Sequence, residues 1–189
     1  MKRTSLHNEA REIFEAALRS VDARAAIQHA ITLNNSLLKA GDIEIDISGR
    51  PIYLVAIGKA SATMAAGLTD VLGERITQGI VCGPTHQALH PQTWSTFAGG
   101  HPLPTEESIV AARSVLRLLA NAENEALVFF LISGGGSAMF ELPINERITI
   151  DELREANRQL VSCGATIAEI NAVRRTFSAV KGGKLALAA

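Results

Sequence analysis

The stretch Leu127–Met139, LVFFLISGGGSAM, constrains the fold more than any other part of the chain. The run Ala126–Ile132 is apolar and rich in β-branched and aromatic side chains, and it ends abruptly at Ser133 and three glycines. A short apolar run bounded in this way is typical of a buried strand in a parallel sheet. The stretch therefore predicts a strand that leads directly into a tight, glycine-rich loop.

This glycine loop, Ser133–Ser137, has the composition of an anion-binding site. Gly134, Gly135 and Gly136 let backbone N–H groups approach a ligand closely, and Ser133 and Ser137 add hydroxyl donors. If a helix begins at about Ser137, its N-terminus would also favour phosphate or carboxylate. The alternative is that the glycines only allow a helix to pack tightly against the sheet.

Neither standard nucleotide-binding motif is complete in the glycine loop. Met139 occupies the third glycine position of G-x-G-x-x-G, and no glycine precedes the Lys-Ser/Thr pair of a P-loop. The loop therefore predicts an anion without identifying a cofactor.

A second strand is expected at Ile52–Ile57, followed by a short loop with Lys59 and an amphipathic helix. A cation at a helix N-terminus opposes the helix dipole by about 0.3–1 kcal/mol. That cost is explained if an anion binds beside Lys59; otherwise Lys59 is an ordinary solvated lysine. We predict a three-layer, Rossmann-like α/β domain with a mostly parallel sheet and helices on both faces, in which the two loops open at one edge.

The remaining segments alternate between helices and strands. Helices are expected at 5–20, 23–39 and 149–163 and after Thr105 and Thr166, and strands within 41–50 and at 76–82 and 93–97. Thr166 and Glu169 match a capping box, so Glu169 is predicted to cap a helix rather than to act as a catalytic acid.

His101 is held in a loop between paired glycines and prolines, which fix its position. It is therefore either a base or substrate ligand, or a residue that ties the loop to a backbone carbonyl. No metal site is expected. Pro84 and Pro91 prevent one continuous helix across Cys82, His86 and His90, and no fourth ligand is near.

The helix that begins at Thr166 would align four polar side chains on one face, with no acid among them. These side chains are Asn171, Arg174, Ser178 and Lys181. The face predicts a second anion contact, although a stripe of charges is also typical of a solvated surface.

Length and charge exclude several classes of protein. A chain of 189 residues favours one domain, and 18 basic against 19 acidic residues give no electrostatic footprint for nucleic acid or an anionic membrane. Two widely separated cysteines and the lack of an apolar span or signal peptide predict a cytoplasmic protein. The composition leaves a homo-oligomer open.

Four segments together closely resemble the type II glycerate kinases, the glycerate 2-kinases that carry a MOFRL domain. The segments are IGKASATMA at 57–65, GGHPLPTEESI at 99–109, LISGGGSAMFELP at 131–143 and EINAVRRTFSAVKGGKLA at 169–186. The resemblance implies ATP-dependent, Mg²⁺-dependent phosphorylation of D-glycerate to 2-phosphoglycerate. It also implies that residues 1–189 form an N-terminal α/β domain and that the MOFRL domain is absent from this chain.

By the same resemblance, Lys59 would stabilise the transferring phosphoryl group, and the glycine loop would hold phosphate or the glycerate carboxylate. Asn171, Arg174 and Lys181 would line the cleft between two domains. Thr176 stands where the family usually has a histidine, which puts any role of that histidine in doubt.

Two alternatives stay open. Members of this family are often labelled hydroxypyruvate reductase, an NAD(P)H-dependent activity, but the chain shows no dinucleotide fingerprint. The other alternative is a catalytically inert domain that binds an anion and lacks part of its active site.

Overall fold

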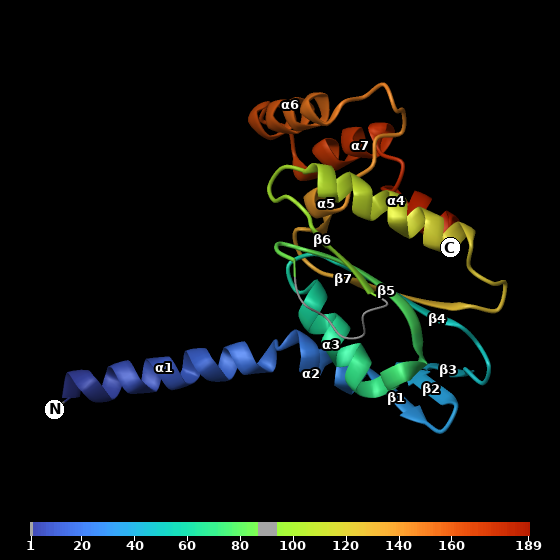
Figure 1. Cartoon of the computed structure of the whole chain (residues 1–189). Helices are drawn as coiled ribbons and strands as arrows, with labels where there is room; N and C mark the ends of the chain where they lie inside the picture. Colours follow the sequence, from blue (N-terminus) through green and yellow to red (C-terminus); the bar gives the residue numbers. More distant parts are fainter. Residues whose placement is uncertain (1, 87–93) are drawn as a thin grey trace.

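The computed structural model describes residues 2–86 and 94–189, and within them four parallel strands form the central sheet (Figure 1). The strands are β4 (Ile52–Ile57), β5 (Ile76–Gly83), β6 (Trp94–Ala98) and β7 (Leu127–Ile132). Their order across the sheet is β6-β5-β4-β7, and all neighbours pair in parallel. The predicted parallel α/β sheet is therefore confirmed.

Helices cover both faces of this sheet. On one face lie α2 (Ala23–Ala30) and α3 (Ser61–Leu72), and on the other lie α4 (Glu106–Ala120) and the single turn α5 (Gly136–Met139). Side chains alternate across β4, because Leu54 and Ala56 join the core cluster with α3 while Val55 and Ile57 join that with α4. The three predicted layers follow from this two-sided burial.

The order of the strands reverses between β4 and β7. The chain runs outward from β4 through β5 to β6, then crosses back along α4 to β7 on the other side of β4. Ile57 and Ile132 pair at the carboxyl end of this ladder, so the loops after both strands leave from the same edge. Ligands of open α/β sheets bind outside such a reversal point.

One predicted helix is only partly correct. The helix expected over 23–39 ends at Ala30, and the chain continues into β1 (Ile31–Asn34), β2 (Leu37–Ala40) and β3 (Ile43–Asp46), which form an antiparallel sheet. The turn between β1 and β2 places Asn35 at φ 55°, a conformation that asparagine tolerates well. The small strand expected within 41–50 is confirmed as β3.

The two ends of the chain lie outside the sheet. Helix α1 (Lys2–Ser20) projects from the body with Ile13, Phe14 and Leu18 exposed (Figure 1). Beyond β7, α6 (Ile150–Ser162) and α7 (Ile167–Phe177) form a helical lobe beside α4 and α5, and α8 (Lys184–Leu187) follows. A short 3₁₀ turn, η1 (Gly73–Arg75), links α3 to β5. In the described chain, no helix is both long and apolar enough for a membrane crossing.

Candidate functional site at the carboxyl edge of the sheet

The loops after β4 and β7 are hydrogen-bonded to each other. The backbone N–H of Lys59 donates to Gly134 O at 2.9 Å, and that of Ala60 donates to Ser133 Oγ at 3.0 Å. Gly58 allows this approach, because a Cβ atom there would lie 2.5 Å from both Ser133 O and Ser133 Oγ, and its φ is 110°. The two predicted loops thus form one structural unit.

Lys59, His101 and the glycine loop, three of the predicted parts of the site, meet at Gly135. A Cβ atom on Gly135 would lie 3.0 Å from His101 Cδ2 and 3.3 Å from Lys59 Cγ, so the histidine and the lysine stem flank this glycine. Gly135 has a φ of 86°, which favours glycine on backbone grounds as well. Both Lys59 and His101 are exposed. The prediction that Lys59 and Gly135 share one edge of the sheet is confirmed.

The serines of the glycine loop differ in their surroundings. Ser133 Oγ accepts from Ala60 N–H and donates its proton to Ile57 O at 3.3 Å. Both bonds link the glycine loop to the end of β4 and the loop that follows it. Ser137 is exposed.

The helix expected to begin at Ser137 is a single turn, Gly136–Met139, because Phe140 is extended and buried. The longer helix that begins beside the glycine loop is α3. Its N-cap residue is Ala60, whose side chain accepts no hydrogen bond from the first backbone N–H groups of the helix.

The loop that carries His101 is anchored along its length. Gly99 N–H donates to Gly83 O at 2.8 Å, and Ala98 N–H donates to Glu107 Oε2 at 2.8 Å. The Ala98 N–H, together with nearby His86, holds the pKa of the Glu107 carboxyl below its ordinary value. Thr105 is the N-cap of α4, as predicted. Sequence reasoning treated Glu107 only as a complement to the helix dipole and missed this anchoring role.

The predicted polar face of α7 does not continue to Lys181. The helix ends at Phe177, because the next residues pair with the segment after α5: Ile144 N–H donates to Phe177 O and Ala179 N–H donates to Leu142 O. Ser178 is consequently extended, at φ −102° and ψ 138°. The expected helical alignment of Ser178 and Lys181 with Asn171 and Arg174 is therefore wrong.

Lys181 instead forms an ion pair with Glu141, a buried carboxylate that is 2% exposed. Ser178 Oγ also donates to Glu141 Oε1 at 2.5 Å, as does the N–H of Leu142 at 3.0 Å. Burial lowers the pKa of Lys181, and the Glu141 carboxylate partly offsets this effect. An acid that lies far away in the sequence thus neutralises Lys181, one of the two cations on the face that was predicted to carry no acid.

The other members of that face stand apart from the glycine loop. Asn171 is exposed on α7, and Arg174 is half-buried there. Among the described residues, no hydrogen bond joins either side chain to Lys59 or to the glycine loop. Whether Asn171, Arg174 and Lys181 line a cleft stays a prediction.

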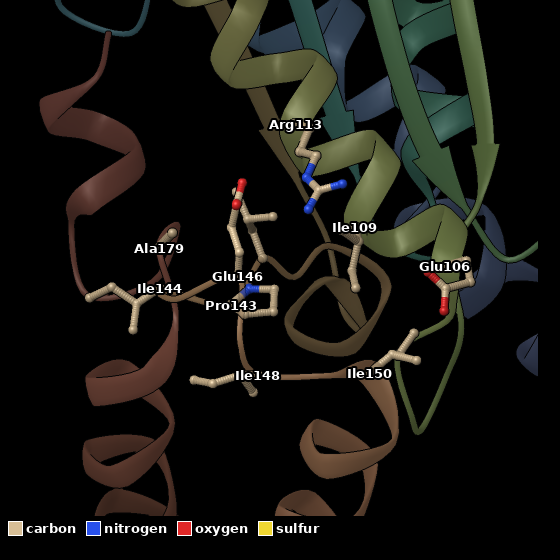
Figure 2. Close-up of a pocket in the computed structure, with 10 residues that line it drawn as sticks. Glu106, Ile109, Arg113, Pro143, Ile144, Glu146, Ile148, Ile150 and Ala179 are labelled. Atoms are coloured by element: carbon tan, nitrogen blue, oxygen red, sulfur yellow. The ribbon is translucent and has the colours of Figure 1, made fainter.

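A pocket of about 460 Å³ lies at a different place, between α4 and the segment that follows α5 (Figure 2). Figure 2 shows Ile109 and Arg113 projecting from α4 toward the segment with Ile144 and Glu146. None of the predicted site residues lines this pocket. We place the site at Lys59 and Gly135 because it lies at the strand-order reversal and gathers an exposed cation with a glycine loop.

The lack of a metal site stays a prediction. In residues 2–86 and 94–189, no three histidine, cysteine or acidic side chains come close enough to hold a metal ion. Cys82 Sγ donates to Met139 O, and burial raises the pKa of its thiol to about 12. His86 lies beside Glu107, and His90 falls outside the described residues.

Comparisons with known proteins agree with the resemblance. The model of a domain of unknown function, DUF4147, matches residues 9–189. Glycerate 2-kinase from Pyrococcus horikoshii is 36% identical over 170 residues, which cover 90% of this chain and 38% of that protein. A protein from Agrobacterium vitis named as a hydroxypyruvate reductase is 36% identical over 182 residues, covering 95% of this chain and 38% of that protein.

Two crystal structures share the fold. A protein from Pyrococcus horikoshii OT3 superposes with a TM-score of 0.84 at 34% identity, and glycerate kinase from Thermotoga maritima with 0.79 at 33% identity. Each match covers 97% of this chain and 41% of the solved chain. The chain therefore spans about two fifths of the length of the proteins it matches.

Proposed function

Because the chain belongs to the family described as domain of unknown function DUF4147, we propose that it is the α/β domain of an enzyme that phosphorylates glycerate. ATP is the proposed phosphoryl donor, and 2-phosphoglycerate the proposed product. The names of the kinase relatives support the substrate class, and the residues at the carboxyl edge support the chemistry.

The observation that carries the proposal is the meeting of Lys59 and His101 at Gly135. Phosphoryl transfer depends mainly on positioning and on positive charge directed at the transferring group. In this proposal the Lys59 ammonium faces that group, and the backbone N–H groups of the glycine loop hold a phosphate or the glycerate carboxylate. His101 contacts the substrate on the other side of Gly135.

The donor set around Gly135 fits an anion better than a metal ion. Lys59 supplies positive charge, and Gly134 has open space where a Cβ atom would stand, so a phosphate group can approach the backbone. In the described part of the chain, the three atoms nearest to a Cβ on Gly135 belong to His101, Lys59 and Met139, and none of these is a carboxylate. Mg²⁺ is proposed to reach the site on the phosphates of ATP, where it neutralises charge, with the chain providing no ligand cage.

A hydroxypyruvate reductase is the second candidate, supported by the name of the Agrobacterium vitis relative. A reductase of this fold class should bind its dinucleotide through G-x-G-x-x-G, and Met139 interrupts that motif here. A third candidate is an anion-binding domain without turnover, which is what we propose for these 189 residues by themselves.

The test is a pair of coupled assays on the full-length gene product. One follows ADP release with D-glycerate and ATP, and the other follows NAD(P)H oxidation with hydroxypyruvate. We expect ADP release only, and NMR of the product should identify the phosphate on the 2-hydroxyl. Robust hydride transfer without ADP release would reverse the ranking, and phosphate on the 3-hydroxyl would correct the product.

A further inference from the structure

Ser108 is fully buried in the first turn of α4, with 0% of its surface exposed. Its hydroxyl oxygen accepts two backbone hydrogen bonds, from Gly100 N–H at 3.1 Å and from Thr105 N–H at 3.0 Å. A hydroxyl oxygen has two acceptor lone pairs, so both are engaged. The two donors stand on either side of His101 in the chain. The Ser108 hydroxyl therefore helps to close the loop that carries the histidine, together with Thr105 Oγ1, which donates to Ala98 O at 3.2 Å.

The same serine links this loop to the glycine-loop side of the site. Its carbonyl accepts from Glu141 N–H at 3.4 Å, in the segment that follows α5. The other end of the His101 loop is fixed by the bond from Gly99 N–H to Gly83 O. Ser108 thus connects the start of α4, the His101 loop and the chain that leaves Gly135.

The imidazole of His101 has little else to hold it. The side chain is exposed, and within the described part of the chain no hydrogen bond to it is recorded. Its place beside Gly135, 3.0 Å from the Cβ position, consequently depends on the backbone of its loop. Removal of the two bonds to Ser108 would loosen that backbone around Gly100. The bonds from Thr105 Oγ1 to Ala98 O and from Arg154 Nε to Pro104 O would still hold the two ends of the loop.

We infer that Ser108 is a positioning residue, which acts on the reaction by holding His101 against the glycine loop. The kinetic part of this inference rests on the proposed function. A displacement of about 1 Å at a reacting group can reduce a rate by about a hundredfold. Loss of the Ser108 hydroxyl should therefore impair turnover through His101 and leave the core of the sheet intact.

The kinetic test is a double-mutant cycle in the full-length gene product, with Ser108→Ala, His101→Ala and the double variant. We expect Ser108→Ala to lower kcat/KM for glycerate by about 10- to 100-fold. The double variant should be no worse than His101→Ala within about threefold, because the serine acts through the histidine. Fully additive losses would overturn the inference. Ser114→Ala, a half-buried serine on the same helix, is the matched control and should stay near wild type.

A second readout does not depend on glycerate kinase activity. Amide hydrogen exchange of the His101 loop should accelerate by about tenfold or more in Ser108→Ala, while the rest of α4 and the Ser114→Ala control keep wild-type exchange. Unchanged exchange at Gly100 and Thr105 would contradict the positioning role. If the wild-type protein shows no kinase activity, the proposed function fails while this measurement still decides the inference.

Ser108→Cys is a second variant, which keeps the inference testable if Ser108→Ala does not fold. The thiol keeps a side-chain atom at the position of the hydroxyl, whereas sulfur is larger than oxygen and only a weak acceptor. We expect intermediate exchange rates and intermediate kcat/KM, with a melting temperature only slightly below that of wild type. A cysteine variant that loses stability but keeps wild-type exchange in the His101 loop would show a purely structural role.

Discussion

Two regions were predicted to contact an anion, the carboxyl edge of the sheet and the segment around Lys181, and their cations have different surroundings in the structure. At the carboxyl edge of the sheet, Lys59 and His101 are exposed and flank Gly135 of the glycine loop. In the segment after α7, the ammonium of Lys181 is paired with buried Glu141. The first cation is available to a ligand, whereas the second is used to hold the chain together. A basic side chain therefore indicates a binding site only when no acid of the same protein neutralises it.

The largest stability effect is expected at Glu141. Its replacement by Ala removes the partner of the mostly buried Lys181 and should cost about 3 kcal/mol or more. This loss corresponds to a fall in Tm of about 6–12 °C, which calorimetry would measure. The exposed Glu146→Ala in the same segment is the control and should change Tm little. A Glu141→Ala variant as stable as wild type would remove the distinction between the two regions.

The opposite pattern is expected for Lys59→Met. The stem of the side chain is kept while the charge is lost, so Tm should stay constant or rise slightly. Steady-state kinetics of the full-length gene product should show kcat/KM reduced by about a hundredfold or more. Exposed Lys39→Met serves as the control. Kinetics close to wild type would make Lys59 a surface lysine, and a large fall in Tm would make it structural.

A smaller effect is expected for Glu107 as a function of pH. Its pKa lies below the ordinary value of 4.5, because the carboxylate accepts from Ala98 N–H and lies beside His86. Its stabilisation is therefore complete above pH 4.5 and is lost as the pH falls through the lower, folded-state pKa. Unfolding of wild type and Glu107→Gln should differ by about 0.5 kcal/mol at neutral pH, since solvent screens this partly exposed group.

The difference between wild type and Glu107→Gln should disappear in acid. Glu106→Gln, in the same helical turn, is the matched control. A difference that grows as the pH falls below 4.5 would contradict the assigned sign.

The smallest effect is expected for Glu169→Ala. Glu169 accepts from Thr166 N–H at 2.8 Å and completes a capping box, as the sequence predicted. Its loss should lower Tm slightly and leave kcat/KM within about twofold of wild type, because the carboxylate caps a helix and performs no chemistry. A large loss of activity at unchanged stability would restore a catalytic role for Glu169.

The meeting of the two loops at the carboxyl edge could be predicted from the sequence, because parallel strands that pair side by side end at the same edge of a sheet. The apolar runs that became β4 and β7 were visible from local composition, and the pairing of Ile57 with Ile132 then brings their loops together. The hairpin after Ala30 was missed, since a left-handed Asn35 decides the turn and the apolar spacing of 23–39 also fits a helix.

The end of α7 could not be read from its own residues. The pairing of Phe177 and Ala179 with the segment after α5 ends the helix, and Glu141 lies far from Lys181 in the sequence. The hydrogen bonds of Ser108 were also missed, although its position three residues after the N-cap is a typical place for a side chain that binds backbone N–H groups.

Binding of the anion at the carboxyl edge of the sheet can be measured by an NMR titration of the ¹⁵N-labelled full-length gene product with D-glycerate and ATP. We predict saturable shifts of the Gly134, Gly135 and Gly136 amides and of the His101 loop, with the amides around Lys181 unchanged. Shifts centred on Lys181 and Arg174, with the glycine loop unaffected, would contradict the account.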